Sequence, residues 1–162
     1  MIKLRIIYES EKISRKRIAC GLVVVNSQTG QILIGKRSDD VDNPGTWAFP
    51  GGKRSSGESY KKTATREFRE ETNFSGPFLN FRHLFTQETD DIHYRLYIAK
   101  ISGKGDTSFQ NFDKREFSRL VWTELEQILK SSNLHPKLKE ILDNEQVVAK
   151  IENYIDKHGK HK

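Results

Sequence analysis

Three glutamates in one polar segment, Glu67, Glu70 and Glu71, have a spacing that would let them bind one metal ion together. At about 100° per residue in an α-helix, all three share an arc of roughly 100°. Like charges at these spacings weaken a helix by about 0.2–0.5 kcal/mol per pair. Their oxygens are the ligands that Mg²⁺ and Mn²⁺ prefer. The trio predicts either a cation site or an acidic face that is solvated or paired with Arg66 and Arg69.

The helix that positions these glutamates is predicted over residues 58–72. Ser55 and Glu58 fit the capping-box pattern, in which a serine is followed three residues later by a glutamate. An apolar stripe recurs every four residues and predicts the face that docks on a sheet: Tyr60, Ala64 and Phe68. Glu67 and Glu71 flank that stripe, so we expect their carboxylates to be partly sheltered, where an unpaired charge is costly.

The surrounding chain predicts a mixed sheet with helices packed on it, in the α/β or α+β class. Apolar runs at residues 18–25 and 31–35, with turn residues between them, indicate a β-hairpin. Cys20 lies in the first run, where a packing role is expected rather than a nucleophilic one. Further strands are expected at 46–49, 78–86, 92–101 and 118–122, and helices at 123–130, capped by Thr123, and at 136–157.

Length and composition indicate a single domain over residues 1–162, with enough apolar residues for a sizeable core. One cysteine excludes a disulfide framework within the chain. No secretory signal and no apolar run near the roughly 20 residues of a membrane span are visible, so a soluble, cytoplasmic protein is expected. The net charge of +6 arises from 28 Lys+Arg against 22 Asp+Glu. It predicts a solvated basic surface or, as the alternative, attraction to phosphates or RNA.

The segment Gly52–Phe74 resembles the Nudix box, whose fixed positions are glycine, glutamate and arginine at set spacings. The matching residues are Gly52-x5-Glu58-x7-Arg66-Glu67-Phe68-x-Glu70-Glu71-x-Asn73-Phe74. The departure is Asn73, which stands where the family has a glycine; asparagine is the usual substitute where a helix ends in a left-handed conformation. The similarity extends over about residues 18–128 and leaves an N-terminal strand and the C-terminal helix as additions.

This resemblance implies a Nudix-type α/β/α sandwich, a mixed sheet between helices, that hydrolyses a phosphoanhydride bond with Mg²⁺ or Mn²⁺. The substrate would be a nucleoside diphosphate linked to another group, or a nucleoside triphosphate. Carried over from the family, Glu67, Glu70 and Glu71 would bind the metal with the carbonyl of Gly51 or Gly52. Either Glu67 or Glu70 would take the proton from water.

Other positions of the resemblance carry two interpretations each. Arg66 would orient a glutamate or form a surface ion pair, and Glu58 would serve the box or only cap its own helix. Glu116 matches a loop in which some members place a further catalytic glutamate, although it is equally well an ordinary loop charge. No histidine has ligand spacing.

Contacts with the substrate are expected from Lys36 and Arg37, toward phosphate, and from Trp47 and Phe49, by stacking on a base; Tyr94 is a further candidate for stacking. Solvation of the two cations and core packing of the aromatics are the alternatives.

Two rival functions remain from sequence: removal of pyrophosphate from an RNA 5′ end, and a non-catalytic domain that senses nucleotides. Substrate identity depends on the loops at 36–46, 86–92 and 102–117, and a homodimer is left open.

Overall fold

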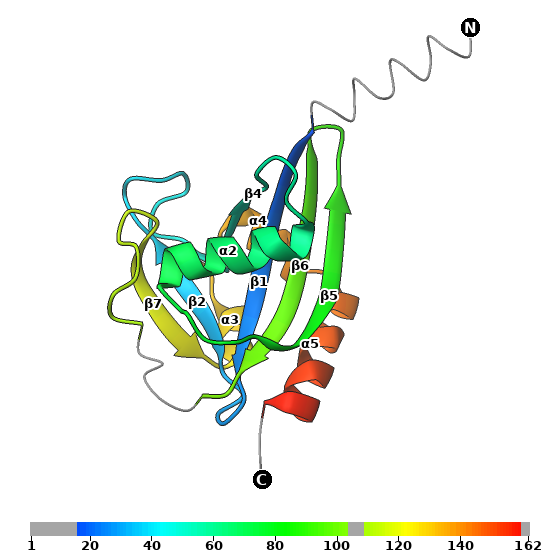
Figure 1. Cartoon of the computed structure of the whole chain (residues 1–162). Helices are drawn as coiled ribbons and strands as arrows, with labels where there is room; N and C mark the ends of the chain where they lie inside the picture. Colours follow the sequence, from blue (N-terminus) through cyan, green and yellow to red (C-terminus); the bar gives the residue numbers. More distant parts are fainter. Residues whose placement is uncertain (1–15, 104–108, 160–162) are drawn as a thin grey trace, which may run out of the picture.

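The computed structural model describes residues 16–103 and 109–159, and it has a mixed β-sheet with helices on both faces (Figure 1). The strands are β1 Arg17–Asn26, β2 Ile32–Arg37, β3 Trp47–Ala48, β4 Gly51–Lys53, β5 Leu79–Glu88, β6 Ile92–Ile101 and β7 Phe117–Thr123. The helices are α2 Tyr60–Thr72, α3 Leu125–Lys130, α4 Pro136–Leu142 and α5 Glu145–His158. The sheet order is β3-β2-β1-β6-β5, with β4 paired to β1 and β7 to β2. The β1–β6 pair is parallel and the other pairs are antiparallel, which confirms the predicted α/β class.

The central strand β1 is covered on both faces, which explains its continuous apolar run. Successive side chains of a strand point to opposite faces of the sheet. Leu22 and Val24 therefore pack toward α2, while Val23 and Val25 pack toward α3, α4 and α5. Cys20 is fully buried on the α2 face, and burial raises the pKa of its thiol to about 11. The thiol is thus a packing group, as predicted.

The helix α2 begins at Tyr60, two residues later than predicted. Ser59 is its N-cap and accepts a hydrogen bond from the Lys62 N–H at 3.2 Å. The Ser55 N–H does donate to Glu58, at 3.3 Å, but this contact closes a turn before the helix. Gly57 lies in that turn with φ +74°, a left-handed conformation that an α-helix cannot include.

The C-terminal end of α2 follows the expectation for Asn73. This residue has φ 59°, and its N–H donates to the Arg69 carbonyl at 2.8 Å. Asparagine is one of the few residues that tolerate the left-handed conformation commonly required after a helix. The departure from the family pattern therefore preserves the backbone geometry at the end of the helix.

The single helix predicted over residues 136–157 is wrong, because α4 and α5 are separate helices. The side chain of Asn144 accepts hydrogen bonds from the N–H groups of Gln146 at 3.0 Å and Val147 at 3.4 Å, and so begins a new helix. Thr123 is likewise not a cap: it ends β7, and the N-cap position of α3 belongs to Glu124. The separate helices α4 and α5 still bury apolar residues against the sheet.

The short strand β4 was expected only as the end of an extended stretch. It pairs antiparallel with β1, with Lys53 opposite Ala19 and Gly51 opposite Gly21.

In residues 16–103 and 109–159, no helix is long and apolar enough to cross a membrane. The expected N-terminal strand lies before residue 16, outside the residues that the structure describes.

Candidate active site

The glutamates of α2 differ in exposure because the helix docks on the sheet through one side. Ala64 and Phe68 are fully buried beneath it. Glu71 lies next to this contact and is 5% exposed. The side chain of Glu67 is 17% exposed and that of Glu70 is 59% exposed. The exposure of the three carboxylates therefore increases from Glu71, which is buried, through Glu67 to Glu70, which is in solvent.

Two glycines of β4 bring the backbone against these carboxylates. The Gly51 N–H donates a hydrogen bond to Glu71 Oε2 at 3.0 Å. A Cβ atom added to Gly52 would lie 2.8 Å from Oε1 of Glu67 and closer still to its Cδ and Oε2. The missing side chain at position 52 thus leaves the space that the Glu67 carboxylate occupies. A side chain on Gly51 would instead collide with the backbone of β1.

Arg66 joins the acidic residues into one network. Its Nε donates to Glu58 Oε2 at 2.8 Å, and its Nη1 donates to Glu67 Oε1 at 2.9 Å and to Glu70 Oε2 at 3.1 Å. Its Nη2 donates to Glu58 Oε1 at 3.1 Å and to the Lys53 carbonyl at 3.0 Å. These bonds lower the pKa of Glu58 to about 2 and raise that of Arg66. Glu58 is therefore an ion-pair partner rather than a cap of α2.

The surroundings of Glu67 and Glu71 disfavour the charged form of both carboxyls. Burial is the main cause that raises the pKa of each, and the charge of Glu116 raises both further. Arg66 opposes the shift at Glu67, while the Gly51 N–H and Arg37 oppose it at Glu71. Both carboxyls thus lie in an environment that a bound cation would stabilise.

The loop before β7 brings Glu116 toward this cluster. The Asp113 N–H donates to the Glu71 carbonyl at 2.9 Å, and the Ser38 N–H donates to the Glu116 carbonyl at 2.9 Å. These backbone bonds fix the loop between the end of α2 and the end of β2. The position of Glu116 explains why its charge acts on two glutamates that lie more than forty residues earlier in the chain.

The donor set fits a hard divalent cation, because it consists of carboxylate oxygens beside a glycine backbone. In the part of the chain that the structure describes, no three acidic, histidine or cysteine side chains are already arranged to hold a metal ion. In this arrangement the guanidinium of Arg66 contacts both Glu67 and Glu70. A metal ion bound to these two glutamates would share their carboxylates with Arg66, which contacts one oxygen of each.

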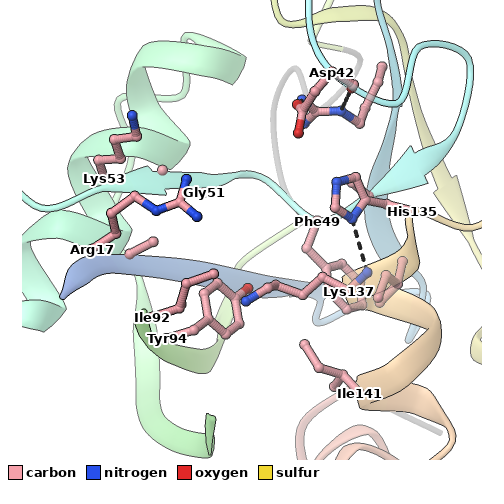
Figure 2. A pocket seen from close by; sticks show the side chains of 15 residues that line it. Arg17, Asp42, Phe49, Gly51, Lys53, Ile92, Tyr94, His135, Lys137 and Ile141 are labelled. Atoms are coloured by element: carbon pink, nitrogen blue, oxygen red, sulfur yellow. Dashed lines mark hydrogen bonds and ion pairs between the residues drawn. The ribbon is translucent and has the colours of Figure 1, made fainter. Parts of the chain in front are cut away.

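A cleft of about 270 Å³ adjoins the two glycines (Figure 2). Gly51, Gly52, Lys53 and Arg17 line one side of it, and His135, Lys137 and Ile141 line the side formed by α4 and the residue before it. Aromatic surface comes from Phe49 and Tyr94. The cleft thus combines cationic groups with apolar surface, a mixture that is typical of small-molecule sites.

The structure places only some of the expected substrate contacts in this cleft. Arg37 and Phe49 line it, and Arg37 is also paired with Asp42. Lys36 is exposed and outside the lining, and Trp47 packs against the apolar core instead.

Sequence reasoning missed Arg17, His135 and Lys137, which also line the cleft. No local pattern could find them, because the fold brings them together from opposite ends of the chain.

Known proteins resemble the chain in sequence pattern and in fold. The family model described as NUDIX domain matches residues 15–144. No curated protein sequence matches the chain.

Solved structures match its fold, with TM-scores of 0.63 for a Deinococcus radiodurans protein and 0.61 for the MutT protein of Methanosarcina mazei. The first is 23% identical, with 80% of this chain and 82% of that chain covered; the second is 21% identical, with 85% and 94% covered. RenU, a Nudix hydrolase from M. smegmatis, is 21% identical at a TM-score of 0.61, over 88% of this chain and 84% of that one.

Proposed function

The chain belongs to the Nudix hydrolase family, whose members hydrolyse pyrophosphate linkages with divalent metal ions, and we propose that its own reaction is Mg²⁺-dependent cleavage of a nucleotide phosphoanhydride. The substrate is a nucleoside diphosphate joined to a second group, or a nucleoside triphosphate. Water attacks phosphorus and the P–O–P bond breaks. For the diphosphate-linked compound, the products are a nucleoside monophosphate and the second group carrying a phosphate.

The observation that carries this proposal is the cluster of carboxylates gathered around Arg66 and Gly51. Glu58, Glu67 and Glu70 share the one guanidinium of Arg66. Glu58 also accepts the Thr63 hydroxyl and the Ser55 N–H, whereas Glu71 accepts the Gly51 N–H. Isolated buried carboxylates are costly. Such an arrangement is stabilised by a cation that binds several of them at once.

We assign metal binding to Glu67, Glu70 and Glu71, with the carbonyl of Gly51 or Gly52 as a further oxygen donor. A bound divalent ion would lower the pKa of its water and offset negative charge on the phosphoryl oxygens. Glu67 or Glu70 accepts the proton that the attacking water loses. Arg66 acts as a positioning residue, because it holds both of these carboxylates.

The cleft next to Gly52 supports a nucleotide as the substrate. Phe49 and Tyr94 offer apolar ring surface for a base or sugar, while Arg17 and Lys53 provide positive charge beside the two glycines. Phosphoryl transfer depends mostly on positioning and on positive charge around the phosphate. The cleft can supply both the positioning of the substrate and the positive charge around its phosphates.

A substrate panel tests this proposal. The protein is incubated with Mg²⁺ and ADP-ribose, dinucleoside polyphosphates, NADH, nucleotide sugars, triphosphates or 5′-triphosphate RNA, and the products are separated by chromatography. We expect turnover of at least one nucleotide and a loss of at least 100-fold in Glu67→Gln.

Glu126→Gln is the matched control, because Glu126 is an exposed glutamate paired with Lys130 on α3. No turnover across the panel, or equal turnover in both variants, would contradict the proposal. Cleavage of the RNA alone would move the substrate to an RNA 5′ end.

A further inference from the structure

We propose that the α4 side of the cleft binds a second phosphate of the substrate, a phosphate monoester that is not cleaved. The inference rests on the proposed function, because it places the anhydride at the glutamates of α2. It narrows the substrate class to nucleotides that carry a phosphate monoester in addition to the anhydride. The residue that would recognise this group is Lys137, with Arg17 opposite it.

Lys137 is a cation held inside the cleft. Its Nζ donates to Gln87 Oε1 at 3.1 Å and lies 4.4 Å from the centre of the Tyr94 ring. Glu140, the acidic residue whose charge acts on it, is itself hydrogen-bonded to Gln87 Nε2 at 2.6 Å. Among the described residues, no carboxylate lies within ion-pair distance of Lys137. The ammonium is thus fixed in place by Gln87 and Tyr94, with no direct contact to a carboxylate of the described residues.

Arg17 approaches the same space from the opposite wall. Figure 2 shows the Arg17 and Lys137 side chains extending into the cleft from β1 and α4. Burial is the main cause that lowers the pKa of Lys137, and the charge of Arg17 lowers it further. The cleft therefore holds two cations that repel each other, which an anion placed between them would relieve.

Glu140 offsets part of the charge of Lys137 from outside the lining of the cleft. Asp42 is the acidic residue in the lining, and it is already paired with Arg37. Lys53 adds a further positive charge on the side of Arg17. A neutral base or sugar would leave these charges unbalanced, whereas a phosphate monoester carries close to two negative charges at neutral pH.

Lys137 is better placed for a second phosphate than for the one that is cleaved. The charges that act on its pKa are those of Glu140 and Arg17, and not those of the α2 glutamates. It extends from α4 over the Tyr94 ring, on the other wall of the cleft from Gly51. A substrate with its anhydride at Gly52 would need a further anionic group to reach Lys137.

Binding of reaction-product analogues tests the inference without turnover. Calorimetry would compare 5′-AMP with adenosine 2′,5′-bisphosphate and adenosine 3′,5′-bisphosphate, first on the unmodified protein. A charge-assisted contact predicts that one bisphosphate binds at least 10-fold more tightly than 5′-AMP. In Lys137→Met this preference is lost, while binding of 5′-AMP changes by less than about threefold.

Lys139→Met is the matched control, since Lys139 is an exposed lysine of the same helix whose Nζ is paired with Asp143 at 3.1 Å. The Lys139→Met variant should still bind one bisphosphate more tightly than 5′-AMP. The inference would be overturned if the unmodified protein bound all three nucleotides with equal affinity or bound neither bisphosphate. It would also be overturned if Lys137→Met lost affinity equally for all three nucleotides. Because binding is measured, these outcomes are independent of whether the substrate panel shows hydrolysis.

Discussion

Replacing Gly52 with alanine tests whether the Glu67 carboxylate must lie against the backbone of β4. The added methyl group would lie 2.8 Å from Oε1 and still closer to Cδ, whereas such atoms normally stay about 3.5 Å apart. The carboxylate would have to retreat by about 1 Å, which it can do because it ends a flexible side chain. A misplacement of about 1 Å in a catalytic arrangement costs on the order of 100-fold in rate. We therefore expect Gly52→Ala to lower kcat/KM by about 100-fold, or about 2.7 kcal/mol of transition-state stabilisation.

Gly51→Ala is the matched comparison, because its methyl group meets backbone that cannot retreat. That group would lie 2.8 Å from the Gly21 Cα atom and closer still to the Cys20 carbonyl oxygen. We expect Gly51→Ala to lower the free energy of unfolding by about 1–3 kcal/mol, as overpacking does. Gly52→Ala should change it by less than about 1 kcal/mol.

Steady-state kinetics with the substrate identified by the panel, and urea denaturation of both variants, would measure these effects. A folded Gly52→Ala protein that keeps kcat/KM within about threefold of the original would refute the reasoning. It would show that the reaction does not depend on the position of the Glu67 carboxylate beside Gly52.

Substitutions at three further positions test the surroundings of the site. The pKa of Glu58 is lowered to about 2 from an ordinary 4.5, so its stabilisation is complete above pH 4.5 and is lost as the pH falls toward 2. Glu58→Gln should therefore unfold at a lower temperature at pH 7 and depend less on pH between about 5 and 2, as thermal unfolding would show. Phe68→Ala, which empties a fully buried position, should cost about 3–5 kcal/mol in urea denaturation, and a cost under about 1 kcal/mol would contradict the packing. Asn73→Ala should cost about 1 kcal/mol in the same measurement and Asn73→Gly should not, because φ at this position is 59°.

The glutamate face of α2 could be predicted from sequence because its determinants are local. The four-residue spacing of Ala64 and Phe68 sets the buried side of the helix, and the same helical period then places Glu71 beside it. Asn73 could be predicted at the end because few residues tolerate a left-handed conformation. The start was less accurate, since both Ser55 and Ser59 are suitable capping residues and the turn at Gly57 decides between them.

The cleft could not be predicted because its walls come from distant parts of the chain. Arg17 and Lys137 are 120 positions apart, and only the folded sheet and α4 bring them to one cavity. The break between α4 and α5 depends instead on a local hydrogen bond. Apolar residues continue on both sides of Asn144, so the pattern of burial alone does not show that its side chain begins a second helix.

The most direct test of the central claim is the Mg²⁺ dependence of the initial rate of hydrolysis for the preferred substrate, measured on the unmodified protein and on Glu71→Gln. Glu71 is suited to this test because it is buried and its carboxylate already accepts the Gly51 N–H. If the glutamates of α2 bind the metal, the rate rises with Mg²⁺ to saturation, and Glu71→Gln needs at least 10-fold more Mg²⁺ or loses turnover. Equal activation curves for the two proteins, or cleavage that persists in excess chelator, would contradict the claim.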